Sequence, residues 1–83
     1  MSSDLIINLD KLHTTEMGID RIKRNLQINV EDVVKYCYDN IIKNTAIIER
    51  KGKNWYIIVD SCKITVNAHS YTIITAHRIV KWA

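Results

Sequence analysis

The sequence predicts an α+β fold in which two to three N-terminal helices pack on one face of a four-stranded antiparallel β-meander. Apolar residues in the first half recur three and four positions apart, which is the spacing of amphipathic helices. The second half alternates short runs of β-branched and aromatic residues with turn residues. Because only two to four residues separate these runs, consecutive strands should pair in antiparallel fashion.

Residues 3–43 are expected to hold the helices, each marked by a capping residue and an apolar stripe. The expected caps are Ser3 with Asp4, Thr14 and Asn29. The expected stripes are Leu5, Leu9 and Leu12 in the first helix, Ile19, Ile22 and Leu26 in the second, and Val30, Val33, Val34, Cys37 and Ile41 in the third. Glu31 and Asp32 are placed in the first turn of the third helix, where the helix dipole favours negative charge.

The meander should span residues 45–80, and the whole chain, residues 1–83, should form a single domain with a small core. Its strands are expected at 46–50, 55–59, 62–66 and 71–80. In the last strand, alternation puts Tyr71, Ile73, Thr75 and His77 on one side and Thr72, Ile74, Ala76 and Arg78 on the other. The two sets are similar in polarity, so the sequence leaves open which side is buried.

The charge of the chain is divided unevenly between its halves. Residues 1–42 carry five Lys or Arg against seven Asp or Glu, and residues 43–83 carry seven against two. The β-rich half is therefore the basic half, and a polyanion such as RNA is its natural partner. A solvated basic surface without a ligand explains the same charges.

Several classes of protein are not supported by the sequence. It has no nucleotide-binding or metal-protease motif and no carboxylate cluster in its β-rich half, so we expect no cofactor and no metal. No apolar run is long enough to cross a bilayer, and Asp4 stands where a signal peptide would be positive, so no membrane association and a cytoplasmic location are expected. Cys37 and Cys62 form no metal-binding pattern and should be reduced, buried thiols.

The β-rich half does contain the groups that cleave RNA without a metal. That reaction needs a base for the 2′-hydroxyl, an acid for the leaving oxygen and cations for the phosphorane. Imidazole suits the proton transfers because its reference pKa is about 6.5. The candidate catalytic residues are His77, His69, His13 and Thr75. Each histidine also has a structural interpretation: a strand-end residue bonded to a carbonyl, a solvated turn residue and a helix cap, respectively.

Candidate substrate-binding residues lie around the expected hairpins. Arg50, Lys51 and Lys53 flank Gly52 at a hairpin tip, where they suit a phosphate clamp or only keep a tight turn soluble. Tyr71 and Arg78 complete the set of candidate substrate contacts. Trp55 and Tyr56 should lie on opposite faces of the sheet, and whichever is exposed is able to stack a base.

Three stretches, LDKLHTTEMGIDRIKRNL, RKGKNWY and ITVNAHSYTIITAH, resemble a family of small bacterial proteins of unknown function, chiefly from Firmicutes. More loosely, the order of elements, the INVEDV helix start and the histidine before an Arg-Ile pair are similar to the barnase, colicin D and RelE ribonuclease superfamily. That resemblance implies an RNA-cleaving toxin restrained by an antitoxin protein. By position it implies a site made of His13, Arg21, Arg50, Lys51, Thr75 and His77.

Two functions from different classes follow as expectations. The first is a metal-independent endoribonuclease of the toxin-antitoxin type that uses general acid/base chemistry. The alternative is a non-enzymatic RNA- or protein-binding module of phage or mobile-element origin, whose basic sheet binds a polyanion in a salt-sensitive way. A homodimer is compatible with both, because a lean core and a sheet edge each invite a partner.

Overall fold

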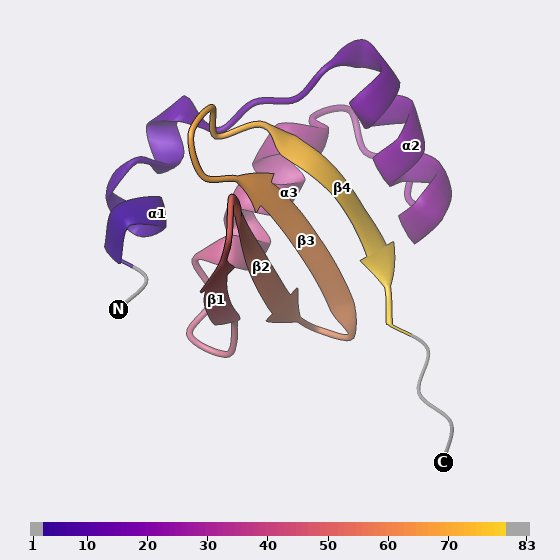
Figure 1. Cartoon of the computed structure of the whole chain (residues 1–83). Coiled ribbons are helices and arrows are strands. Elements are labelled where there is room, and N and C mark those ends of the chain that lie inside the picture. Colours follow the sequence, from indigo (N-terminus) through magenta and orange to yellow (C-terminus); the bar gives the residue numbers. More distant parts are fainter. Residues whose placement is uncertain (1–2, 80–83) are drawn as a thin grey trace.

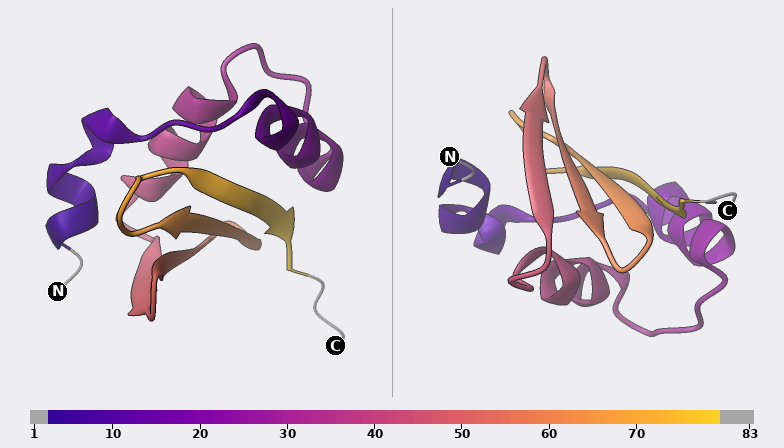
Figure 2. Two further views of the ribbon diagram at one scale, coloured as in Figure 1. Left: turned by 45° about the horizontal axis from the view of Figure 1, so that its top comes forward. Right: turned by 90° about the horizontal axis from the view of Figure 1, so that it is seen from below.

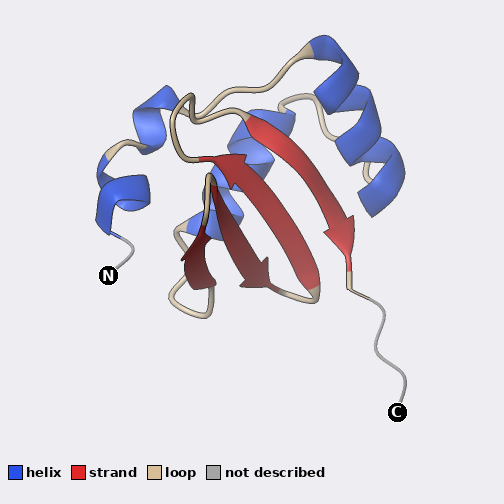
Figure 3. Ribbon diagram, in the orientation of Figure 1, coloured by secondary structure: helices blue, strands red, loops and turns tan. Residues whose placement is uncertain are grey.

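A computed structural model describes residues 3–79 and confirms the α+β class (Figure 1, Figure 3). The elements in chain order are α1 (Ser3–Ile7), the 3₁₀ turn η1 (Leu9–Lys11), α2 (Glu16–Leu26), α3 (Val33–Ile41), β1 (Ile47–Lys51), β2 (Asn54–Val59), β3 (Cys62–Asn67) and β4 (Ile73–Arg78). The strands form one antiparallel sheet in the order β1-β2-β3-β4, which is the predicted meander. Within residues 3–79, no helix combines the length and the apolar character needed to cross a membrane.

The helices lie on one side of the sheet, and the other side is not covered by any helix of residues 3–79 (Figure 2). Strand β2 explains this layering, because its side chains alternate between the two faces. Trp55, Ile57 and Val59 are buried against the helices, whereas Tyr56 and Ile58 point to the uncovered side and are only half-buried. The expectation that Trp55 and Tyr56 lie on opposite faces is confirmed. We call the uncovered side the open face.

Strand β4 breaks the strict alternation that the sequence predicted. Its pairing with β3 shifts register, so that Thr65 faces Thr75 while the next residue, Val66, faces Ile73. This irregularity leaves Ile73 and Ala76 both buried under the helices. The prediction that Ile73 shares a side with Thr75 is therefore wrong, because one extra residue in β4 is absorbed at the bulge. Thr75 and His77 lie on the open face.

The second helix begins one residue later than predicted. Thr15, not Thr14, is the N-cap, and its hydroxyl accepts a hydrogen bond from the N–H of Gly18 at 3.0 Å. Thr14 instead donates its hydroxyl to the carbonyl of Ile73 in β4, at 2.9 Å. Either threonine could cap the helix, and the bond of Thr14 to β4 leaves Thr15 as the cap. Thr14 also lies close to the helix backbone, because a Cβ at Gly18 would overlap Thr14 Oγ1.

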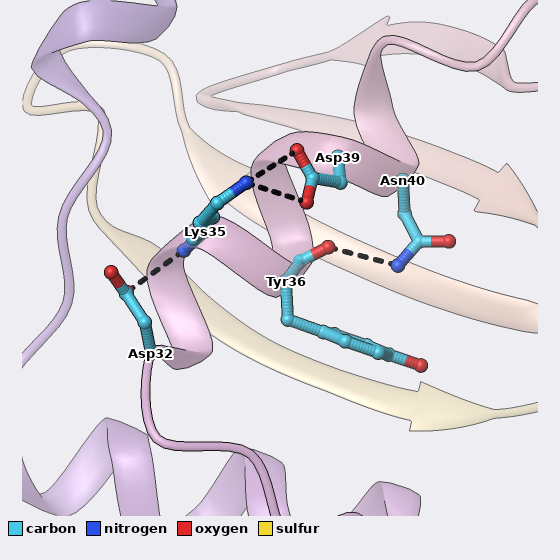
Figure 4. Close-up of polar contacts among 5 residues, drawn as sticks. All are labelled: Asp32, Lys35, Tyr36, Asp39 and Asn40. Atoms are coloured by element: carbon cyan, nitrogen blue, oxygen red, sulfur yellow. Dashed lines mark hydrogen bonds and ion pairs between the residues drawn. The ribbon is translucent and has the colours of Figure 1, made fainter.

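The other two helices also differ in extent from the prediction. Asp32 caps α3 by accepting from the N–H of Lys35 at 3.0 Å (Figure 4), so the helix does not begin at Asn29. The first predicted helix is divided into α1 and η1, yet its three leucines are all buried as expected. Cys37 on α3 is buried, and that burial, followed by the nearby Cys62, raises the pKa of its thiol to about 12.

Candidate functional site

The three histidines are distributed between the two ends of β4. His13, in the segment before α2, adds to the start of β4 through a parallel bridge with Thr72. His69 lies in the turn that precedes this strand, and His77 lies near its other end. Five residues of extended chain separate Thr72 from His77, which is about 17 Å. The structure therefore does not bring His77 together with a second histidine.

The imidazole of His13 is held at both nitrogens. Nδ1 lies 2.8 Å from the carbonyl of Lys11, to which it donates, and Nε2 lies 3.0 Å from Thr72 Oγ1. Thr72 Oγ1 is in turn 2.7 Å from Ser70 Oγ, and the Ser70 hydroxyl lies 3.2 Å from Asn67 Oδ1. These bonds fasten the N-terminal segment to the start of the sheet.

Tyr71 also serves this end of β4. Its φ of 60° places it in the left-handed region, and its amide donates to the carbonyl of Asn67 at 2.9 Å to close the turn. Its ring packs against Trp55 at a tilt of 37° with centroids 5.3 Å apart, and Lys11 Nζ lies 5.6 Å from the Tyr71 ring centroid. The Tyr71 side chain, expected to contact substrate, is thus half-buried in the fold.

The cations of the β1–β2 hairpin separate between the two faces. Arg50 faces Trp55 across the strand pair on the helix side, with its guanidinium 5.5 Å from the indole, and Nε donates to the carbonyl of Gly52 at 3.0 Å. Lys51 pairs with Asn54 on the open face. Because β1 lies three strands from β4, at about 4.8 Å per strand, the hairpin tip and Lys53 are far from His77.

Arg78 is engaged by the end of α2. Its Nε and Nη2 both donate to the carbonyl of Leu26, at 3.2 and 3.0 Å. That carbonyl has no partner within the helix, and a cation at a helix C-terminus also complements the dipole. Of the residues predicted to bind substrate, Arg78 thus has its guanidinium committed to a capping contact.

A different group of polar residues meets where α2 runs along β4 (Figure 1). Asn25 Nδ2 lies 3.3 Å from Thr75 Oγ1. Arg21 is one helical turn before Asn25 and therefore on the same stripe of α2. His77 is two residues after Thr75 and on the same side of β4. We call Arg21, Asn25, Thr75 and His77 the α2–β4 seam.

Lysine and aromatic side chains extend the seam across the open face. His77 lies directly opposite Lys63 of β3, and Thr75 lies opposite Thr65. Lys63 Nζ in turn lies 4.9 Å from the ring centroid of Tyr56 on β2. His77 is exposed, and the hydrogen bonds formed within residues 3–79 leave its imidazole free.

The seam therefore presents the His77 imidazole opposite the Lys63 ammonium, with Thr75 and Asn25 next along it and Arg21 one helical turn further back on α2. Imidazole exchanges protons near neutral pH, and the two cations suit an anionic group such as a phosphate. In the described part of the chain, no three His, Cys, Asp or Glu side chains gather as a set of metal ligands.

Sequence reasoning missed Asn25 and Lys63. Asn25 follows Arg21 by four residues, so helical spacing alone would have placed both on one face. Lys63 faces His77 only through the register of β3 and β4, and a bulge interrupts that register. Arg21 itself was suggested only by the ribonuclease resemblance.

The fold and the seam define a class of small α+β protein with one helix-covered face and one open sheet face that carries Lys63 and His77. Over residues 6–77, the chain matches the family described as Protein of unknown function (DUF3781). It therefore belongs to this family, which confirms the resemblance to a family of unknown function. No curated protein and no solved structure matches it.

Proposed function

We propose that this protein is a metal-independent endoribonuclease of the toxin type and that the α2–β4 seam is its active site. The observation that carries the proposal is the placement of His77, which is exposed and has no side-chain hydrogen bond within residues 3–79, two residues after Thr75 and directly opposite Lys63. RNA cleavage through the 2′-hydroxyl requires a proton-transfer group and cations at the phosphate, and in this proposal His77, Lys63 and, from α2, Arg21 supply them.

In this proposal the phosphate lies between Arg21 and Lys63. The neutral imidazole of His77 removes the proton of the 2′-hydroxyl as that oxygen attacks the phosphorus. The bond from phosphorus to the 5′-oxygen then breaks, and the leaving oxygen takes a proton from water or from the imidazolium just formed. The products are a 2′,3′-cyclic phosphate and a free 5′-hydroxyl. Arg21 and Lys63 neutralise the charge that develops on the phosphorane.

The test uses the full chain, a labelled single-stranded RNA and EDTA throughout. Wild-type protein should produce fragments ending in 2′,3′-cyclic phosphate, and the same sequence with 2′-deoxyribose should stay intact. His77→Ala should lower the rate by about 100-fold or more, which is the usual contribution of a general acid or base. His69→Ala is the matched control, because His69 is also exposed but lies in the turn before β4.

The proposal fails if wild-type protein leaves RNA intact, or if His77→Ala cleaves at the wild-type rate. Circular dichroism of each variant separates a lost reaction from a lost fold.

A second function, an RNA-binding module without catalysis, is favoured by a different observation. Lys63 Nζ lies 4.9 Å from the ring of Tyr56, and both side chains are on the open face. An aromatic ring beside a cation suits an unpaired base and its phosphate. This function is supported if the protein binds single-stranded RNA with an affinity that falls steeply with salt and cleaves none of it.

A further inference from the structure

The open face contains a hollow that the α2–β4 seam does not use. It has a volume of about 400 Å³ and is lined from three strands by Ile47, Glu49, Lys51, Tyr56, Ile58 and Lys63. A volume of this size is within the range of sites that bind small molecules. The register of β1 and β2 determines how the lining residues are arranged: Glu49 lies opposite Tyr56, and Ile47 lies opposite Ile58.

The walls of the hollow suit a flat, partly apolar group. Ile47 is 65% exposed, which is unusual for a large aliphatic side chain on a sheet, and Ile58 beside it is half-buried. Tyr56 adds an aromatic ring, and its hydroxyl accepts from Asn54 at 3.3 Å. An unpaired nucleobase packs on aliphatic side chains and stacks on aromatic ones.

The charged side chains of the hollow indicate which hydrogen-bonding group a bound base needs. Lys51 and Lys63 are two cations, and Glu49 is the one acidic side chain in the lining. The other acid of the sheet half, Asp60, forms an ion pair with Lys43, whereas Glu49 forms no ion pair within residues 3–79. A carboxylate repels phosphate, so in a phosphate-binding surface its useful partner is a hydrogen-bond donor.

Nucleobases differ in the donors that their edges present. Cytosine, adenine and guanine carry exocyclic amino groups, and a carboxylate accepts well from such a donor. Uracil has carbonyl oxygens in the corresponding positions, and these would face the Glu49 carboxylate with like partial charge. The hollow therefore has the chemistry to distinguish bases by their amino groups.

We propose that this hollow is a nucleobase subsite, in which Ile47, Ile58 and Tyr56 hold one unpaired base of RNA and Glu49 accepts from its exocyclic amino group. This inference rests on the proposed function in one respect only, namely that the open face binds RNA. Lys63 connects the two sites, because it lines the hollow and also lies opposite His77. The bound base therefore belongs to a nucleotide close to the scissile phosphate.

The test measures binding in the full-length His77→Ala chain, so that RNA stays intact. The probes are fluorescent oligouridylates of about ten nucleotides, long enough for a single-strand site. One central nucleotide is varied in two matched pairs: cytidine against uridine, and guanosine against inosine, which differs from guanosine only by lacking the amino group. The amino-bearing member of each pair should bind about 10-fold more tightly.

Glu49→Gln should abolish both preferences, because the amide keeps the size of the side chain but has a single acceptor oxygen and no charge. Glu31→Gln is the matched control, since Glu31 is an exposed acid on the helical side of the chain. Tyr56→Ala should weaken binding of all the oligonucleotides by about 10-fold or more, the usual effect of losing one stacked base.

The inference is overturned if the paired oligonucleotides bind equally to the Glu49 form, or if Glu49→Gln keeps the preference. These results are independent of catalysis. Cleavage by wild-type protein with no amino preference would refute the subsite and leave the nuclease standing. An amino preference with no cleavage would refute the nuclease and leave the subsite standing.

Discussion

The two ends of β4 have similar polar residues but treat them in opposite ways. At the start of the strand, His13 and Thr72 are bonded to each other, and the His13 imidazole has a partner at each nitrogen. At the far end, within residues 3–79, the side chain of Thr75 has one hydrogen bond, of 3.3 Å with Asn25, and the exposed imidazole of His77 has none. The polar side chains at the first end are bonded to one another, whereas those at the second end remain available to a ligand.

This difference distinguishes polar groups that are already bonded within the protein from polar groups that are available to a ligand. A hydrogen bond formed within the protein stabilises the fold, and its groups are then not available to a ligand. A polar group held on a rigid strand with no partner contributes little to the fold but is already positioned for a ligand. We therefore assign the start of β4 to folding and propose that the far end is the functional one.

The largest effect expected from this assignment is on activity at the seam. Arg21→Ala should lower the rate of RNA cleavage by about 100-fold or more, because a cation that stabilises the phosphorane is lost. Stability should change little, since Arg21 is exposed. The matched control is Lys23→Ala, which removes a cation about half a turn around the same helix. Equal losses in the two variants would show only a general effect of charge.

The next effect in size is on stability at the opposite end. His13→Ala removes two solvent-exposed hydrogen bonds, to the Lys11 carbonyl and to the Thr72 hydroxyl, so the free energy of unfolding should fall by roughly 1–2 kcal/mol. Urea denaturation measures this loss, and His69→Ala should change stability by less than about 0.5 kcal/mol. If His13→Ala instead kept its stability and lost cleavage, the assignment of the two ends would be reversed.

The smallest expected effect is on the pH dependence of stability and comes from the thiol of Cys37, which is buried on α3. Burial raises the pKa of Cys37 to about 12, while an unfolded cysteine loses its proton around pH 9.0. Above that pH the unfolded chain binds fewer protons than the folded one, so stability should fall as pH rises, by at most about 1.4 kcal/mol per pH unit. Replacing Cys37 by valine should remove this part of the alkaline slope. If the free energy of unfolding of the valine variant fell between pH 8 and 10 as steeply as that of the wild type, the burial of the Cys37 thiol would be contradicted.

The sequence predicted the architecture better than the site. Periodicity and short connections were sufficient for the helices, the meander and the opposite placement of Trp55 and Tyr56, because these depend on local patterns. Strict alternation failed at β4, because a bulge that shifts Ile73 relative to Thr75 has no local signature in this sequence. The cap of α2 was predicted at Thr14 and lies at Thr15, because Thr14 is bonded to β4, a contact between residues far apart in sequence.

The seam was only partly predictable for the same reason. Thr75 and His77 were identified by residue type, but their neighbours come from α2 and β3, which are distant in sequence. Conversely, Arg50 and Arg78 looked like ligands for phosphate, and the structure gives each guanidinium a partner inside the protein. Residue type indicates what a side chain can bind, and only the tertiary contacts show whether it is already bound.

The most direct test of the central claim is to map where RNA binds. Isotope-labelled His77→Ala protein would be titrated with a short single-stranded RNA while the amide resonances of residues 3–79 are followed by NMR. We expect the largest shifts at Arg21, Asn25, Lys63 and Thr75, with little change at His13 and Thr72. Shifts centred on His13 and Thr72, or on the helices away from β4, would contradict the claim that the far end of β4 is the functional one.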